Sequence, residues 1–273
     1  MSGILDQWRL GLGLPGVMVI DGHTHAFGWD GWRTPLEVAA ELIRLMDGYC
    51  VDASCVMGGM SLQNGVDVRL NNDFLLECVR HAPDRLIPFA HVNPHVELSD
   101  TLAELDRVFG EGVRGIKLYN EPQGYPGDGP NMMAVYSFAQ DHNMLILNHL
   151  WSEVEISRIV REFPNLVLIR GHGGASVISR TYANVYDNIW SLNRLGLIED
   201  GVRKYGSDKL LLGSDAPLSD PAVGVGMVVY SDISDRDKRA ILGLNMACLL
   251  EKVGALPNWL WGRYRCAAAD SNT

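Results

Sequence analysis

Two histidines stand at the end of the first apolar stretch of the sequence. Residues Val17–Ala26 have the apolar and β-branched composition of a strand, and they include His23-Thr24-His25. Because residues two apart on a strand point to the same side, both imidazoles would project together from its carboxyl end. Two neutral imidazoles that converge on one point are the start of a metal site, whereas the alternative is a pair of ordinary loop histidines.

Further residues capable of metal binding or catalysis recur where later apolar segments end. They are Lys117, His149, His172 and Asp215. Taken singly, each histidine could be a core residue, and Asp215 could be a helix cap before Pro217. Lys117 could hold a substrate by its charge, or it could react with carbon dioxide to form a carbamate that bridges two metal ions. The recurrence at successive strand ends favours one shared site.

The rest of the sequence alternates between strand and helix signals. Thr34 and Pro35 have the N-cap and first-turn chemistry of a helix start, and Ser99-Asp100 with Gly110 is expected to bound a later helix. Strands are expected over 17–26, 50–57, 86–92, 113–119, 144–147, 166–170, 183–190 and 209–215. Helices are expected over 36–49, 71–81, 101–109, 132–142, 153–163, 194–205 and 239–252.

Eight such β–α units imply a parallel sheet that closes on itself. The predicted fold class is therefore α/β, with a single (β/α)8 TIM barrel over residues 1–273 and residues 254–273 as a possible C-terminal extension. The aromatic residues of that extension could dock on the barrel or on a second subunit. Active sites of this fold lie at the carboxyl ends of the strands, where the candidate residues fall.

Strand phase indicates which of these side chains face the barrel axis. Lys117 and Tyr119 on the fourth strand share the axis-facing phase with His149 at the end of the fifth strand. Asp21 and Arg170 lie one layer deeper in the same phase. Because a buried charge needs a partner, we expect these two residues to pair.

Composition narrows the class of protein. The 273 residues are 47% hydrophobic and 21% charged, which is typical of a soluble globular protein with a sizeable core. The formal charge of −10 argues against nucleic-acid and membrane surfaces, since both need clustered Lys and Arg. Five scattered cysteines and the lack of a signal-peptide pattern favour a cytoplasmic protein, and a homodimer or higher homo-oligomer is possible.

Aromatic and basic residues at or beyond the strand ends could shape a pocket for a small-molecule substrate. The candidate substrate-binding residues are Arg33, Tyr119, Tyr125 and Trp151. The alternative is that the aromatic residues pack loops onto the barrel. His91, at the end of the third strand, is interpreted mainly as a structural residue, with a pocket role as the alternative.

As an ordered set, the motifs resemble those of the amidohydrolase superfamily, in detail its amidohydrolase-related branch of metal-dependent TIM-barrel hydrolases and decarboxylases. The resemblance covers nearly the whole chain, and it is specific to the superfamily but not to one reaction. It rests on Ile20-Asp-Gly-His-Thr-His25, Gly115-Ile-Lys-Leu118, Leu147-Asn-His149, Gly171-His-Gly173, Leu212-Gly-Ser-Asp-Ala-Pro217 and Ile241-Leu-Gly-Leu-Asn245.

The resemblance implies roles for six residues. His23, His25 and Asp215 look like the near-universal metal ligands, and His149 looks like the ligand from strand five. His172 matches the strand-six histidine, which binds a second metal in two-metal members and orients water or substrate in one-metal members. Lys117 stands where two-metal members carry a carboxylated lysine. Either one or two ions therefore fit the pattern.

The predicted chemistry is that of a divalent ion that activates water and polarises a carbonyl group. Zinc is the first expectation, although imidazole and carboxylate ligands also accept Mn, Fe or Co. Asp215 is expected to act as general base towards the water and then as acid towards the leaving group. His172 would stabilise charge on the substrate oxygen or bind a second ion.

Three functions are compatible with this chemistry. The first is a hydrolase that cleaves a C–N or C–O bond in an amide, lactam, lactone or ester. The second is a one-metal decarboxylase or hydratase of an aromatic or unsaturated carboxylic acid, in which Arg33 or Lys117 would hold the carboxylate. The third is a non-catalytic barrel that keeps the site for ligand binding.

Overall fold

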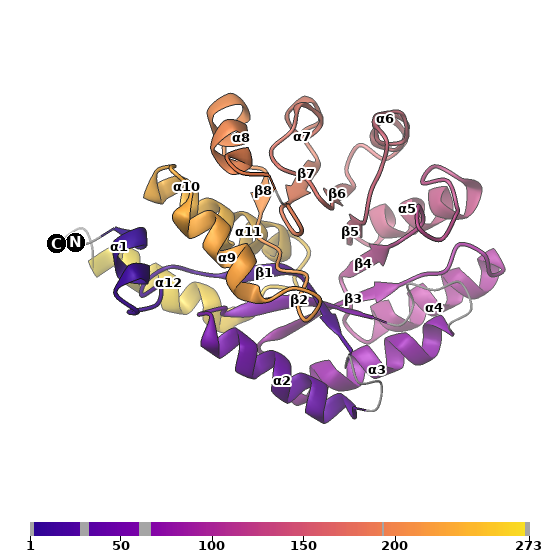
Figure 1. The fold of residues 1–273 in the computed structure, drawn as a ribbon. Helices are drawn as coiled ribbons and strands as arrows, with labels where there is room; N and C mark the ends of the chain where they lie inside the picture. Colours follow the sequence, from indigo (N-terminus) through magenta and orange to yellow (C-terminus); the bar gives the residue numbers. More distant parts are fainter. Residues whose placement is uncertain (1–2, 28–32, 60–66, 193, 271–273) are drawn as a thin grey trace.

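The computed structural model describes residues 3–27, 33–59, 67–192 and 194–270, and it confirms the predicted barrel. Its strands follow one another in a single sheet in chain order, and every neighbouring pair is parallel. Helices surround the sheet on its outer side (Figure 1). The strands are β1 (Ile20–Ala26), β2 (Ala53–Gly58), β3 (Leu86–His91), β4 (Gly115–Leu118), β5 (Leu145–Asn148), β6 (Val167–Arg170), β7 (Val185–Asn188) and β8 (Leu210–Leu211).

The predicted helices are all present in the structure, with shifted ends. They are α2 (Pro35–Gly48), α3 (Val68–His81), α4 (Leu98–Gly110), α5 (Pro130–Asp141), α6 (Glu153–Glu162), α8 (Leu197–Tyr205) and α11 (Asn245–Lys252). Helix α10 (Asp235–Arg239) was not predicted, and it ends at the first residue expected for the last helix. The structure adds helices that we did not predict, namely α1 (Ile4–Arg9), α7 (Val177–Thr181), α9 (Pro221–Tyr230) and α12 (Asn258–Asp270).

Helix α2 begins as its sequence predicts. Pro35 is the first helical residue, and the Thr34 hydroxyl accepts a hydrogen bond from the Glu37 amide at 3.3 Å. The Glu37 carboxylate in turn accepts from the Thr34 amide at 2.8 Å, which completes a capping box. Local chemistry therefore fixes the point at which the chain leaves the loop after β1.

Two helix predictions were wrong in detail. Helix α4 begins before the predicted Ser99-Asp100 cap, and Asp100 lies in its first turn, where a carboxylate favours the helix dipole. The helix expected over 239–252 is interrupted by a π-helical turn at Ala240–Leu244. In this turn the Ile241 carbonyl accepts a hydrogen bond from the Leu212 amide at 3.0 Å, so the interruption ties the helix to the end of β8.

The barrel closes between β8 and β1 through a short set of backbone hydrogen bonds. The Gly22 amide donates to the Leu212 carbonyl at 2.9 Å, and the Asp215 amide donates to the His23 carbonyl at 2.9 Å. A β carbon on Gly22 would lie only 2.9 Å from the Leu212 oxygen, so glycine permits this close approach. Closure thereby joins the two candidate ligand segments, which are 192 residues apart (215 − 23 = 192) in the sequence.

The apolar core is divided by the sheet, as strand phase predicts. Ile116 and Leu118 of β4 pack outward against the helices, together with Val135 of α5. Leu145 and Leu147 of β5 belong instead to the cluster inside the barrel. The interior layer therefore supports the strand ends from below, where the polar candidate residues begin.

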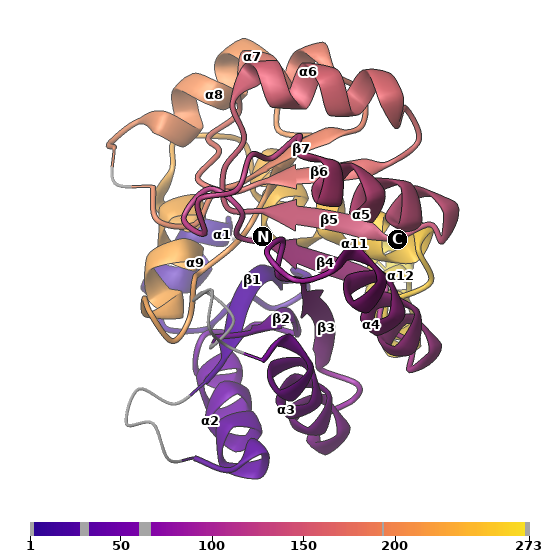
Figure 2. The ribbon, with the colours of Figure 1, turned by 90° about the vertical axis from the view of Figure 1, so that its right-hand side faces the viewer.

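The C-terminal segment docks on the barrel, at the end opposite the candidate site. Leu260 of α12 is buried against the interior cluster, and Trp259 packs beside it. The Tyr264 hydroxyl donates to the Asp52 carboxylate at 2.7 Å, just before β2 begins. Figure 2 shows α12 at one end of the barrel. Of the two alternatives for this segment, the structure shows contact with the chain's own barrel.

The predicted pairing of Asp21 with Arg170 is wrong. Arg170 pairs with Asp187 of β7, with its Nε and one terminal nitrogen each 2.8 Å from the same carboxylate oxygen. The other carboxylate oxygen accepts hydrogen bonds from the Ser176 amide and the Ser179 hydroxyl. Asp187 is fully buried, so it satisfies the arginine and also fixes the loop that follows β6.

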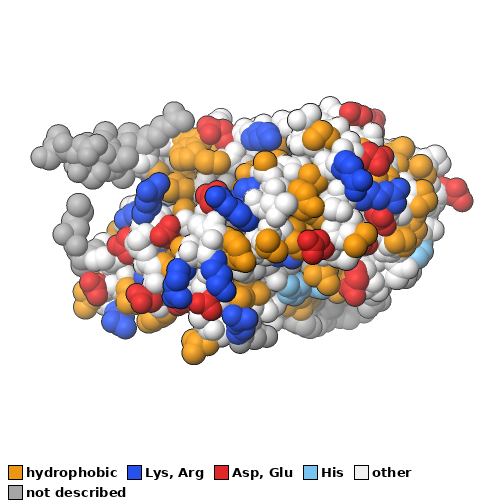
Figure 3. Space-filling view, turned by 90° about the horizontal axis from the view of Figure 1, so that it is seen from above, with side chains coloured by type: hydrophobic (Ala, Val, Ile, Leu, Met, Phe, Trp, Pro, Cys, Tyr) orange, Lys and Arg blue, Asp and Glu red, His pale blue; other side chains and the backbone are white. Residues whose placement is uncertain are grey.

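One face of the molecule carries charged side chains of both signs. On the side of the molecule in Figure 3, Lys and Arg side chains are interspersed with Asp and Glu. Within the described ranges, no helix has the length and apolar character required to cross a membrane.

We predict that Asp187→Asn lowers the free energy of unfolding by about 3 kcal/mol or more, because it leaves the largely buried Arg170 guanidinium without its charge partner. Urea denaturation followed by circular dichroism measures this loss. Asp200→Asn is the matched control, since Asp200 pairs with exposed arginines on the surface, and it should change stability by less than about 1 kcal/mol. Equal losses in the two variants would contradict the structural role of Asp187.

Candidate metal centre and active site

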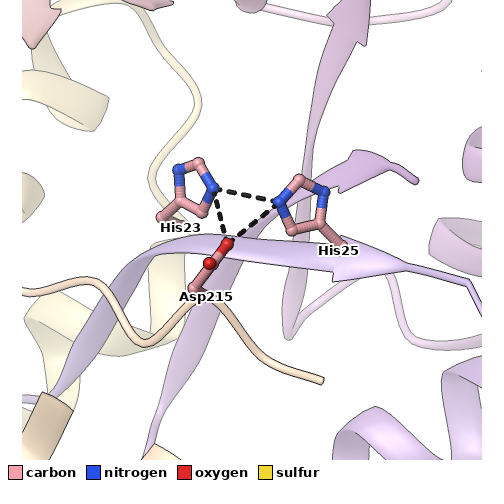
Figure 4. Close-up of side chains that lie close together, drawn as sticks. All are labelled: His23, His25 and Asp215. Carbon is pink, nitrogen blue, oxygen red and sulfur yellow. Dashed lines mark hydrogen bonds and ion pairs between the residues drawn. The ribbon is translucent and has the colours of Figure 1, made fainter. Parts of the chain in front are cut away.

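A tight cluster of polar side chains joins the ends of β1 and β8. The Nε2 atoms of His23 and His25 lie 3.0 Å apart, and Asp215 Oδ1 lies 3.2 Å from each of them (Figure 4). The two histidine side chains are almost completely buried, whereas that of Asp215 is 16% exposed. Within the described ranges, these residues form the one group whose ligand atoms could hold a metal ion together. The strand-phase prediction for His23 and His25 is therefore confirmed.

A β-bulge and a buried carboxylate set the position of these ligands. The register between β1 and β2 shifts between Asp21 and Thr24. Asp21 Oδ1 accepts hydrogen bonds from the His23 amide at 3.1 Å and from the Ser214 amide at 3.0 Å. Burial raises the pKa of Asp21 to about 6, against the effect of these hydrogen bonds. Asp21 therefore links the backbone of His23 to the backbone of Ser214, the residue before Asp215. In this way it positions both ligand segments.

Burial and hydrogen bonding give the cluster the protonation states that metal ligands need. Burial lowers the pKa of both His23 and His25, so the imidazoles are neutral. Burial would by itself raise the pKa of Asp215, but hydrogen bonds from the two histidines hold it well below the usual range. Two neutral imidazoles and one ionised carboxylate are ready to bind a divalent cation without releasing a proton from these three groups.

Lys117 lies at the centre of the wider site. Its side chain is buried, and within the described structure its Nζ atom has no hydrogen-bond partner. Nζ lies 4.8 Å from the centre of the Trp190 ring. Burial lowers the pKa of Lys117 to about 7, while the Asp215 charge opposes this shift. A substantial fraction of this amine is therefore uncharged near neutral pH.

The charge of Lys117 also reaches every histidine of the site. After burial, it is the next largest cause that lowers the pKa of His149, which falls to about 4, and of His172. It acts in the same direction on His23, His25 and His91. The amine of β4 is therefore surrounded by imidazoles from β1, β3 and the ends of β5 and β6.

His149 and His172 form a second pair beside the three-residue cluster. Their ring centres lie 4.5 Å apart with an edge-to-face geometry, and Tyr119 contacts the other side of His149 at 4.7 Å. The His172 Nε2 atom is buried without a partner within the described ranges. Its backbone is left-handed, with φ of 51°, and that of Asp215 is also left-handed, with φ of 66°. Such strained backbone is common at functional sites.

The sequence analysis missed Trp190 as a component of the site. This buried residue follows β7, and its ring stacks on His23 with 3.6 Å between ring centres. It also contacts His172 at 5.1 Å. A β carbon on Gly171 would collide with the indole ring, so glycine leaves room for it. Trp190 is the last residue of the predicted seventh strand. Because it lies two residues after Asn188, the two side chains share one face of the strand, and this phase could have identified Trp190 as a site residue.

The four predicted substrate-binding residues occupy different environments. Tyr119 contacts His149, and the exposed Arg33 lines a small recess with Phe27, whose ring lies 6.1 Å from that of His25. Tyr119 therefore lies next to a candidate ligand, whereas the recess at Arg33 is lined by Phe27, Pro217 and residues of α2.

Tyr125 and Trp151 have packing contacts instead. The Tyr125 hydroxyl accepts from the Asn131 amide at 3.2 Å, and the ring packs against His95. Trp151 is buried, and its indole nitrogen donates to the Tyr136 hydroxyl at 3.1 Å. These contacts favour the alternative in which the aromatic residues pack the loops onto the barrel.

The donor set fits a divalent cation. The cluster offers two imidazole nitrogens and a carboxylate oxygen, and Lys117 Nζ and His172 Nε2 are buried polar atoms without a partner within the described ranges. Nitrogen and oxygen donors of this kind accept Zn, Mn, Fe or Co. The structure thus brings all six residues of the two-metal pattern into one electrostatic network, although His149, His172 and Lys117 lie outside the tight cluster.

Solved structures share the fold of this chain at low sequence identity. A 2,6-dihydroxybenzoate decarboxylase from Rhizobium is 15% identical, with a TM-score of 0.67 over 86% of this chain and 98% of that chain. A dihydroxybenzoic acid decarboxylase from Polaromonas, with bound manganese and the inhibitor 2-nitroresorcinol, is 16% identical, with a TM-score of 0.69 over 86% and 97%. A protein named amidohydrolase II is 18% identical, with a TM-score of 0.68 over 85% and 99%.

Comparison of the sequence with curated proteins gives no match. In contrast, residues 20–251 match the family model Amidohydro_2, described as amidohydrolase. This match spans the barrel from the first residue of β1 to the penultimate residue of α11. The chain therefore belongs to the amidohydrolase-2 family.

Proposed function

We propose that the protein is a metal-dependent hydrolase that cleaves a C–N or C–O bond in an amide, lactam, lactone or ester. The observation that carries this proposal is the position of Asp215, which lies 3.2 Å from both imidazoles and is the most exposed of the three residues. When a divalent ion is bound, it supplies Lewis acidity, which polarises a carbonyl group and makes water more acidic. Zinc is our first candidate, with Mn, Fe or Co as alternatives.

Asp215 is the general base of the proposed reaction. Its carboxylate is ionised in the pH range of most enzymes, since His23 and His25 hydrogen-bond to it. It accepts a proton from the attacking water and then donates that proton to the leaving nitrogen or oxygen. Ser191 lies 3.4 Å from the second carboxylate oxygen and orients it.

His172 acts on the substrate oxygen in the one-metal form of this mechanism. Its Nε2 atom is buried and has no partner within the described ranges, so it is available to a ligand. As a hydrogen-bond donor it stabilises the negative charge that develops when water attacks the carbonyl carbon. In a two-metal form, His172 and His149 would be the residues that hold the second ion.

Lys117 determines which form is present. Because burial leaves much of its amine uncharged, the nitrogen lone pair can add to the carbon of carbon dioxide. A nitrogen–carbon bond forms, one C–O π bond becomes an oxygen lone pair, and one proton passes from the nitrogen to solvent water. The resulting carbamate would carry a negative charge on its two oxygens, and Lys117 in this form would help to hold a second ion.

A second candidate is a one-metal decarboxylase of an aromatic carboxylic acid. The flat ring of Trp190 lies beside His23, and the Lys117 amine lies 4.8 Å from that ring. The Lys117 amine, which has no hydrogen-bond partner within the described ranges, supports binding of a carboxylate. Turnover of a panel of lactones, amides and hydroxybenzoates, with carbon dioxide release measured separately, distinguishes the two reactions.

We predict that His25→Ala weakens zinc binding by more than about 100-fold, because loss of an outer partner alone commonly costs 10–100-fold. Elemental analysis and a zinc titration measure the effect. In the parent protein, zinc at about 100 times its Kd should add about 2.7 kcal/mol to stability. His81→Ala is the control, because His81 lies at the end of α3 and is not a candidate ligand. Unchanged zinc binding in His25→Ala would contradict the proposed metal site.

We predict that Asp215→Asn with metal retained lowers kcat by about 10²–10⁴-fold, the usual contribution of a general base. The amide keeps the size of the side chain but cannot accept the proton. Asp220→Asn is the matched control, because Asp220 is the N-cap of α9 and asparagine caps equally well. Near-full turnover by metal-loaded Asp215→Asn would refute the assigned role.

A further inference from the structure

His91 is a buried histidine that the proposed mechanism does not use. It is the last residue of β3 and has no measurable exposure to solvent. Both of its ring nitrogens are buried and have no hydrogen-bond partner within the described ranges. A neutral imidazole always has one N–H donor and one acceptor, and leaving such groups unpaired in a core is costly. The position therefore calls for a partner.

Strand register places His91 beside Lys117 on the inside of the barrel. The two residues are paired neighbours of β3 and β4, so their side chains leave the sheet on the same face. On the other side of β4, Lys117 is the register partner of Leu147 in β5. Leu147 belongs to the interior cluster, so this face of the sheet points into the barrel. The side chains of His91 and Lys117 are thus adjacent, and both carry polar nitrogen atoms without partners.

The backbone of His91 is held by a buried asparagine. Asn72 of α3 accepts a hydrogen bond from the His91 amide at 2.9 Å and donates to the His91 carbonyl at 3.2 Å. The same Asn72 amide donates to Glu104 at 2.9 Å, and Glu104 pairs with Arg107. A polar network from two helices therefore fixes the strand end that carries this histidine.

The partner that these groups lack is an acceptor. In its protonated form Lys117 offers only donors, as a carbamate its nitrogen also keeps a donor N–H, and an imidazole offers at least one donor in either tautomer. The neighbouring imidazoles of His23 and His25 direct their Nε2 atoms towards Asp215. The Gly58 backbone lies near His91 and favours its protonated form, without the geometry of a hydrogen bond. A small planar anion at the lysine nitrogen would satisfy both residues.

We propose that His91 is a positioning residue that donates a hydrogen bond to a carboxylate-type anion at the Lys117 nitrogen. Two sources share this chemistry. One is the carbamate that Lys117 forms with carbon dioxide, and the other is the carboxylate of a substrate bound to the protonated amine. In both cases His91 holds one oxygen of the anion from β3, so that the other oxygen faces the metal ligands. The inference rests on the proposed metal-dependent function of the same site.

The experiment compares the parent protein with His91→Leu, which keeps the bulk of the side chain and removes the donor, and His91→Gln, which restores a donor. His95→Leu is the control, because His95 lies nearby in the loop after β3 and already bonds to the Gln123 carbonyl. Each zinc-loaded protein is titrated with 13C-bicarbonate and observed by carbon NMR, with the metal content measured in parallel. Each is also titrated with benzoate and, for comparison, with the neutral benzamide. Circular dichroism establishes that each variant is folded.

We expect the half-saturating concentration of the bound anion to rise by about tenfold or more in His91→Leu, as for loss of other partners that orient a metal ligand. His91→Gln should recover most of the affinity, and His95→Leu should behave like the parent protein. A carbamate resonance that follows this order identifies carbon dioxide as the source. Benzoate binding that follows this order, without such a resonance, identifies a substrate carboxylate.

The inference is overturned if neither anion binds the parent protein, or if His91→Leu and His91→Gln bind it as the parent does. If His91→Leu does not fold, His91→Gln is compared with His91→Asn, whose shorter amide cannot reach the same point. Weaker anion binding by His91→Asn than by His91→Gln then supports the inference, and equal binding overturns it. Failure of the proposed function is distinguishable, because it appears as full turnover by Asp215→Asn, whatever the His91 variants do.

Discussion

The closure of the barrel between β8 and β1 is the constraint on which the site depends. β8 is short, and it is joined to β1 by a few backbone hydrogen bonds, which include those of the Gly22 and Asp215 amides. The buried Asp21 carboxylate of β1 adds a further bond to the Ser214 amide. The same hydrogen bonds that complete the sheet bring Asp215 against His23. Stability and function thus share one set of contacts, because any change that opens the seam also separates the ligands.

The charges and unpartnered nitrogen atoms at this end of the barrel underlie both the metal site and the anion site that we propose. Within the described ranges, the imidazoles around Lys117 are neutral because they are buried, and Asp215 is the carboxylate that they share. A divalent ion would satisfy the converging Nε2 atoms, and a carboxylate-type anion would satisfy Lys117 and His91. Buried polar groups are usually hydrogen-bonded, so these nitrogen atoms are where we expect a ligand to bind.

The loops that carry the remaining candidate residues are fixed by buried polar groups one layer away. Asp187 binds both Arg170 and the loop that contains His172, while Asn72 holds the end of β3 at His91. Gly171 and Gly22 leave space where a side chain would force strands or Trp190 apart. The geometry of the site therefore depends on residues that carry no catalytic chemistry themselves.

The sequence by itself determined the barrel, the helix start at Thr34-Pro35 and the convergence of His23 with His25. These features follow from periodicities of 2 and 3.6 residues and from local capping chemistry, which a single sequence displays. Only contacts between distant segments show that Arg170 pairs with Asp187, that Trp151 packs on Tyr136, and that Trp190 stacks on His23. Partners across strands depend on register and on barrel closure. Both arise from contacts between segments far apart in the chain, which local pattern does not specify.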